Sequence, residues 1–364
     1  MPMFRSALAQ VISTVPAALI DSSQRLILLS LGLLASSSAW AVHSRSSHCE
    51  TETSNWTGAY YYKVIATQPS FGIRGQIVLP HFKQDPARYF HVDHTHLDEP
   101  PSWEGTLDVA SVYVGATAPH GEVDVGINYE QVHERPNVVV LVDSTTAEAA
   151  RSRAHRFSLD YSVTPPVLRS PKTTEIAHGW AAIDQQIAAL HLTRLRAYVP
   201  FWRTDHWNAD PGTIFLPGET ITLAVTLDRQ GSFALTIQSA GGEKIFSKSF
   251  TYAPFVSPTG PGFIFKRINS IDQFALLNQG RKVVGNEPGQ MPGHHAPAIP
   301  THARAIGGKW NFVSLILADG HTEPLGPPRC RQVRPHDLAS KYSAIFNSAG
   351  VDPATGGEAI DITP

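Results

Sequence analysis

Short runs of apolar residues, many of them alternating with polar residues, recur along most of the chain between Gly, Pro, Asp and Asn. A period of two residues places every second side chain on one face of a strand, so each run predicts a strand with one face in a core. The runs are residues 60–66, 75–79, 110–116, 122–129, 138–143, 220–228, 232–239, 244–252, 262–268 and 310–317. With 364 residues, the chain is long enough to bury a large core between two sheets. The pattern predicts an all-β protein, an antiparallel two-sheet β-sandwich.

One segment has helical spacing instead. In residues 181–196 (AAIDQQIAALHLTRLR), Ile183, Ile187 and Leu190 recur on one face of a helix. Residues 284–304 are rich in Gly, Pro and His, and residues 347–364 are small and polar. We therefore expect one helical insertion, a loop at 284–304 and a flexible tail at 347–364.

The start of the chain has the order of a secretory signal. Arg25 precedes the apolar run 26–35 (LILLSLGLLA), and a small polar stretch leads to Ala39-Trp40-Ala41. The apolar run is too short for an ordinary membrane span. We expect a signal peptide at residues 1–41, a secreted or periplasmic protein, and no stable membrane insertion after cleavage.

Export agrees with the cysteine content. Cys49 and Cys330 are the two cysteines of the chain, and in an oxidising compartment they can form one internal disulfide. The alternative is two unpaired thiols.

Asn55-Trp56-Thr57 matches the N-glycosylation pattern, which matters only in a eukaryote.

Charge and motifs exclude several function classes. Lys plus Arg is 29 and Asp plus Glu is 31, and these charges are scattered, so no nucleic-acid partner is expected. No phosphate-binding loop, dinucleotide fingerprint or G-x-S-x-G elbow is present, and no cofactor is expected. His94 and His96, within residues 91–99 (HVDHTHLDE), would share one face of a strand and are the candidate metal ligands. The alternative is a polar loop, because nothing in the sequence brings a third ligand near.

The order of motifs along the chain resembles a known family. The motifs are residues 53–59 (TSNWTGA), 75–80 (GQIVLP), 110–116 (ASVYVGA), 122–130 (EVDVGINYE), 197–203 (AYVPFWR), 216–225 (LPGETITLAV), 231–250 and 262–266 (GFIFK). This series resembles the eqolisins, which are secreted, acid-active glutamic peptidases. The resemblance covers about residues 53–270, with an apparent insertion at about 133–191. It implies one domain over residues 42–346, a jelly-roll sandwich of the concanavalin or legume-lectin type.

The resemblance also identifies two positions. The family's chemistry depends on one Gln and one Glu, which project from neighbouring strands into a concave face. Asp124, in residues 123–129 (VDVGINY), and Lys266, in residues 263–266 (FIFK), occupy the matching places. An ion pair between Asp124 and Lys266 would occupy both groups, so the mechanism of the family is not expected to survive.

Three interpretations of Asp124 and Lys266 remain open. They form a structural ion pair, or they line a binding groove, or they belong to a rebuilt catalytic site in which Lys266, with a depressed pKa, acts as a base. The resemblance places further candidate groove residues on or beside the strands of the concave face. These are Tyr60, Tyr62, Tyr113, Tyr129, Trp202, His206 and Trp207.

Such aromatic rings can stack on sugars or hold peptide side chains. The alternative is that the alternate members of residues 60–62 are sandwich core. The sequence thus predicts a secreted eqolisin-like sandwich without peptidase activity that binds a glycan or a peptide in its groove. The alternative function is a divergent hydrolase, either an acid peptidase or a glycan-acting enzyme.

Overall fold

The computed structural model describes residues 48–54, 58–90, 105–135, 137–145, 149–257, 259–276, 282–284 and 297–364. The expected signal peptide, the Asn55 glycosylation pattern and the candidate metal ligands His94 and His96 lie outside these residues. The chain divides into residues 1–45 and residues 46–364, and the description that follows concerns the second unit. No helix among the described residues has the length and the hydropathy of a membrane span.

The first sheet carries the candidate site. Its described strands lie in the order β1 (Glu50–Ser54), β24 (Cys330–Pro335), β2 (Ala59–Ala66), β20 (Ile264–Leu276), β7 (Asp108–Ala118), β8 (Gly121–Gln131), β15 (Arg196–Arg203) and β16 (Trp207–Ala209), with β21 (Lys282–Val284) beside β20. All neighbours are antiparallel except β1 and β24, which run parallel.

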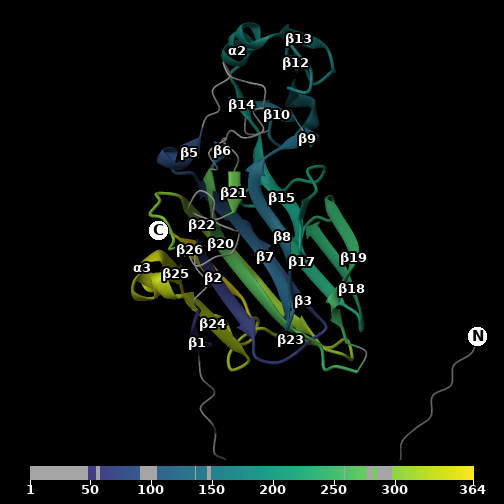
Figure 1. The fold of residues 1–364 in the computed structure, drawn as a ribbon, viewed down its shortest axis with the longest axis vertical. Coiled ribbons are helices and arrows are strands. Elements are labelled where there is room, and N and C mark those ends of the chain that lie inside the picture. The colour runs from purple at the N-terminus through teal and green to yellow at the C-terminus, as the bar shows by residue number, and fades with distance from the viewer. Residues whose placement is uncertain are drawn as a thin grey trace, which may run out of the picture. The chain divides into compact units, whose positions relative to one another are not determined.

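The second sheet packs against the first (Figure 1). Its described strands are β19 (Ile245–Val256), β18 (Gln230–Ser239), β17 (Thr220–Leu227), β3 (Gly72–Val78), β22 (Arg304–Ile316), β26 (Glu358–Ile362) and β25 (Phe346–Ser348), with β23 (Thr322–Pro324) and β4 (His81–Lys83) beside β22. Val125 and Ile271 of the first sheet share one buried core with Ile77 and Leu223 of the second. The expected antiparallel two-sheet sandwich is confirmed, and each of the ten predicted runs overlaps a strand, with overhangs of one or two residues at some ends.

Residues 133–194 form a separate sheet, of which the sequence predicts one strand, at 138–143. Its described strands are β9 (His133–Arg135), β10 (Val138–Asp143), β11 (Arg156–Asp160), β12 (Val167–Arg169), β13 (Glu175–His178) and β14 (Leu192–Arg194). Val139, Leu159 and Leu168 belong to a core of its own. The chain enters this sheet from the end of β8 and leaves it into the start of β15 (Figure 1).

The helix of this segment is shorter than predicted. Helix α2 (Trp180–Ala189) ends before Leu190, and His191 has a left-handed φ of 50°. Leu192 then begins β14, whose Arg194 pairs with Leu141 of β10. The helical spacing continues past residue 190 in the sequence, but pairing with β10 takes the last residues into the sheet.

The expectation of a flexible tail at residues 347–364 is wrong. Strands β25 and β26 belong to the second sheet, and Glu358 of β26 is buried. The Glu358 carboxylate accepts a hydrogen bond from Arg267 of β20, and both side chains are fully buried. This ion pair fixes the end of the chain between the two sheets.

The remaining described elements are short: η1 (Pro86–Arg88), β5 (Tyr89–Phe90), β6 (Gly105–Thr106), η4 (Arg153–His155), η5 (His336–Lys341) and α3 (Tyr342–Ile345). The predicted disulfide is confirmed: Cys49 and Cys330 are bonded, with their Cα atoms 4.9 Å apart and a sequence separation of 281. The bond joins the residue before β1 to the first residue of β24.

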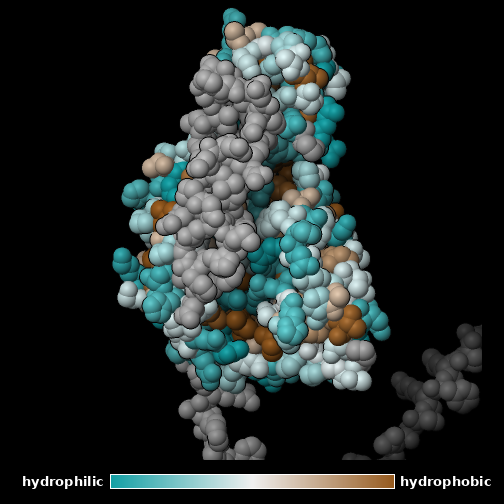
Figure 2. All heavy atoms as spheres, viewed as in Figure 1, coloured by the Kyte–Doolittle hydropathy of each residue, from teal (hydrophilic) through white to brown (hydrophobic). Residues whose placement is uncertain are grey.

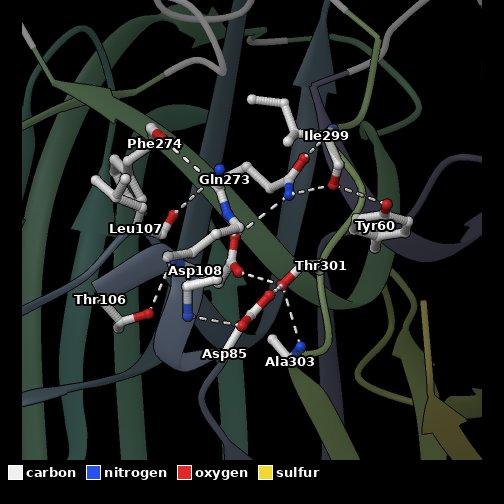
Figure 3. Close-up of polar contacts among 12 residues, drawn as sticks. Tyr60, Asp85, Thr106, Leu107, Asp108, Gln273, Phe274, Ile299, Thr301 and Ala303 are labelled. Carbon is white, nitrogen blue, oxygen red and sulfur yellow. Dashed lines mark hydrogen bonds and ion pairs between the residues drawn. The ribbon is translucent and has the colours of Figure 1, made fainter. Parts of the chain in front are cut away.

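A buried polar network joins the end of β20 to the start of β7 and to the segment before β22 (Figure 3). The Asp108 carboxylate accepts from Arg88 Nε at 2.8 Å and from Gln273 Nε2 at 3.3 Å. Thr301 donates to Asp108 and Asp85, the second buried carboxylate of the network. Each acid has hydrogen-bonding partners within the protein, which is the condition for burying it. We interpret this network as a structural one.

Candidate functional site

The side chains of Asp124 and Lys266 meet on the face of the first sheet that points away from the core. On β8, Val123 and Val125 are in the core, so Asp124 between them points to the opposite face. On β20, Lys266 alternates in the same way with Phe265, which is a core residue. The expectation that both lie on one face is confirmed.

Their strands are not adjacent, which corrects the sequence-based expectation. Strand β7 lies between β8 and β20, and its Gly115 is in register with both Asp124 and Lys266. A Cβ atom at position 115 would lie 2.6 Å from Asp124 Oδ1 and 2.9 Å from Lys266 Cε. A glycine here therefore leaves the space in which the two side chains meet across the intervening strand.

The ion pair is buried and is part of a larger network. Lys266 Nζ lies 2.7 Å from Asp124 Oδ1, and both side chains are almost fully excluded from solvent, with 2% and 3% exposed. Lys266 also pairs with Glu122, two residues before Asp124 on β8. Arg203, which faces Asp124 from β15, pairs with Asp124 and lies 3.4 Å from Glu122. Two acids and two bases thus alternate around one site.

The network holds both central groups in their charged forms. Burial alone raises the pKa of Asp124, but Lys266 and Arg203 outweigh burial and hold it below its ordinary value. Burial likewise lowers the pKa of Lys266, but Asp124 and Glu122 outweigh burial and raise it. The hypothesis that Lys266 is a base with a depressed pKa is therefore contradicted.

A second lysine on this face, Lys63, has the depressed pKa that the hypothesis assigned to Lys266. Lys63 of β2 is in register with Ile268, two residues from Lys266 along β20, and lies on the same face. None of the described residues forms a hydrogen bond or an ion pair with its ammonium group. Burial, and then the nearby charge of Lys266, lower the pKa of Lys63 to about 8.

A third acid lies on the same face, further along β20. Burial raises the pKa of Asp272, and Ser111 of β7 donates a hydrogen bond to its carboxyl group. Asp272 is six residues from Lys266, too far along the strand to join the four-residue network.

Aromatic side chains border the network on the β15 side. Trp207 of β16 is 47% exposed and stacks on Phe201, with ring centroids 4.3 Å apart and planes 13° apart. Phe201 in turn meets the edge of Tyr113 at 5.7 Å. Of the candidate groove residues, Tyr113 and Trp207 therefore lie on the face of Asp124 and Lys266. His206 is exposed in the turn between β15 and β16, next to Trp207.

Four candidate groove residues are wrongly assigned, because their positions in the strand alternation turn them to the opposite face. Tyr60 and Tyr62 are in the sandwich core, as the alternative interpretation expects. Tyr129 packs on Tyr198 at 5.2 Å, against the same core. Trp202 stacks on Phe246 at 6.0 Å, between the two sheets.

Sequence reasoning missed Glu122, Arg203 and Lys63. Glu122 carried a signal, because it stands two residues before Asp124 in a strand and must share its face. Arg203 and Lys63 come from β15 and β2, and only the strand order brings them to Asp124. Among the described residues, no group of three His, Cys, Asp or Glu side chains could hold a metal ion.

Three solved structures are similar to this chain. Two are Scytalido-glutamic peptidase, one with a peptide-based transition-state analog (TM-score 0.40) and one with a transition-state analog inhibitor (TM-score 0.41), each 9% identical over 84% of this chain and 98% of that chain. The third is SCP-B, a member of the eqolisin family of peptidases, in a complex with the tripeptide Ala-Ile-His (TM-score 0.39, 8% identity, 84% and 98% covered).

The similarity is one of fold alone. No protein-family model matches the chain, and no curated protein matches it. The chemistry of the site therefore has to follow from the residues of this chain.

Proposed function

We propose that this chain is a secreted binding protein without acid peptidase activity, and that its ligand lies across the outer face of the first sheet beside Trp207. The observation that carries the proposal is the buried pair of Asp124 and Lys266, closed on both sides by Glu122 and Arg203. Asp124 and Lys266 stand at the two positions where the resemblance to the eqolisins would require a Gln and a Glu.

Peptide hydrolysis needs a neutral donor for the oxyanion and a group that can exchange a proton with water and the leaving nitrogen. Asp124 is a carboxylate even in mild acid, because its pKa lies below the ordinary value. At 4 Å, a carboxylate repels a developing oxyanion by about 4 kcal/mol at an effective dielectric constant of 20, which is roughly a thousandfold in rate. Lys266 cannot offset this repulsion while it is bound to two acids.

The surroundings favour binding. An exposed tryptophan that is stacked on a second ring offers a flat apolar surface that is already ordered. Lys63 and Arg203 are nearby donors for hydroxyl or carbonyl oxygens. A row of rings beside polar groups suits the C–H faces and hydroxyls of a glycan, or the side chains and backbone of a peptide. The disulfide between Cys49 and Cys330 supports an oxidising compartment outside the cytoplasm.

The experiment is to screen the unmodified protein against an array of neutral and acidic oligosaccharides and an array of unstructured peptides. Each hit is then titrated with Trp207→Ala and with the control Ile245→Ala, which removes another exposed apolar side chain, from an edge strand of the second sheet. We expect Trp207→Ala to weaken binding on the order of tenfold and Ile245→Ala to leave it unchanged. Equal effects of the two variants, or no hit on either array, would contradict the proposal.

One observation favours the alternative of a divergent hydrolase. Asp272 has a raised pKa and is therefore the acid on this face that keeps its proton to the highest pH among those with a resolved shift. If the chain hydrolyses a glycan or a peptide, Asp272→Asn should abolish the activity while Lys266→Met leaves part of it. Binding without turnover in the unmodified protein decides against this alternative.

A further inference from the structure

A pocket of about 380 Å³ lies in the sheet of residues 133–194, apart from the network around Asp124. Helix α2 contributes Trp180 and Ile187, and β14 contributes Leu192 and Arg194. The start of β5 contributes Tyr89, and the start of β15 contributes Arg196. Its volume is in the usual range for sites that bind small molecules.

One wall of the pocket is apolar and aromatic. The rings of Tyr161 and Trp180 lie 5.2 Å apart with their planes 31° apart. Leu141, Leu159 and Ile187 also line the pocket. A flat apolar ring can stack on such a surface and is favoured there over a fully polar molecule.

The pocket lining also includes a guanidinium group, that of Arg196. Arg196 lies with its Cζ 5.5 Å from the centroid of the Tyr89 ring and is hydrogen bonded to the Tyr89 side chain. No carboxylate among the described residues pairs with Arg196, although burial lowers its pKa. An arginine remains protonated even so, and a partly buried guanidinium favours a bidentate anionic partner. Asp184, the acid that lines the pocket, is exposed on α2.

We propose that this pocket binds an aromatic carboxylate, with the ring on the wall of Tyr161 and Trp180 and the carboxylate on Arg196. Figure 2 shows hydrophobic residues scattered among hydrophilic ones on the visible face of this part of the molecule. The same chemistry occurs in a free aromatic acid and at the carboxyl end of a peptide that ends in Phe. This site is separate from the proposed function, and neither depends on the other.

The test uses the unmodified protein and two pairs of probes in titration calorimetry. The first pair is phenylacetate and phenylacetamide, and the second is the tripeptide Ala-Ala-Phe and its C-terminal amide. We expect each bound acid to bind at least about tenfold more tightly than its amide, because only the acid offers a charge to Arg196. Binding of phenylacetate alone identifies a free acid as the source, and binding of the tripeptide alone identifies a peptide end.

Two variants locate the binding. Arg196→Gln keeps a hydrogen-bonding side chain but removes the charge, and it should weaken binding of the acid on the order of tenfold. Arg151→Gln removes an exposed charge from the same segment and should change nothing. If Arg196→Gln fails to fold, the comparison of each acid with its amide on the unmodified protein still tests the proposal. Equal affinity for acids and amides, no saturable binding of either acid, or equal effects of the two variants would overturn the proposal.

Discussion

Removing the ammonium group of Lys266 tests whether the buried network is as tightly coupled as its geometry indicates. Lys266→Met keeps the length and the apolar stem of the side chain but leaves Asp124 buried, with Arg203 as its remaining cation. Loss of one partner of a buried ion pair typically costs about 3–5 kcal/mol. Because Arg203 and Glu122 each keep over a third of their side chains in solvent, we expect the lower end, about 3 kcal/mol.

The assay is urea unfolding at pH 7 of the unmodified protein, Lys266→Met, Asp124→Asn and the double variant. The double variant removes both charges at once and should recover most of the loss, so the two changes should show a coupling energy of about 2 kcal/mol or more. Acid sensitivity gives a second readout. Folding lowers the pKa of Asp124, so its contribution to stability is present above about pH 4 and is lost as the pH falls through the folded-state pKa.

In Lys266→Met, the pKa of Asp124 rises, and acid unfolding should begin at a higher pH than in the unmodified protein. A loss below about 1 kcal/mol with no coupling, which is the range of a solvent-exposed ion pair, would refute this account of the site.

Three further predictions concern stability. Glu358→Gln should lower the free energy of unfolding by about 3–5 kcal/mol in urea unfolding, because it leaves Arg267 buried without its carboxylate. Lys63→Gln should raise it on the order of 2 kcal/mol at pH 7, because folding lowers the pKa of Lys63 to about 8 and disfavours its charged form; unfolding measured at several pH values should show the gain disappear as the pH approaches 10.5. Replacing Cys49 and Cys330 together by Ala should cost about 5 kcal/mol in the chain-entropy model, measured by urea unfolding of the oxidised protein and the double variant.

The sandwich could be predicted because the strand signal is local. In β8, a period of two fixes which residues share a face, and the core residues Val123 and Val125 show which face is inside. The meeting of Asp124 and Lys266 came from the resemblance, since they lie on strands separated by β7. No local pattern contains that strand order.

The period of two residues did not determine which face of the sheet the aromatic residues occupy. Residues 60–62 are three consecutive tyrosines, so alternation puts the first and third on one face and the second on the other, without saying which face is inside. The end of the chain was missed for a different reason. Glu358 is a polar residue in a small, polar segment, and its partner Arg267 is 91 residues away in sequence. Ile360 and Ile362 of the same strand alternate into the core, but the strand is short, and the burial of Glu358 rests on an ion pair that hydropathy does not report.

The central proposal is that the closed ion pair of Asp124 and Lys266 leaves the chain without peptidase activity. The most direct measurement is digestion of denatured casein from pH 2 to 7 by the purified protein, with Asp124→Ala and Lys266→Ala as controls. The account predicts no cleavage by the unmodified protein or by either variant at any pH in this range. Cleavage by the unmodified protein that depends on pH and is lost in Lys266→Ala would contradict it.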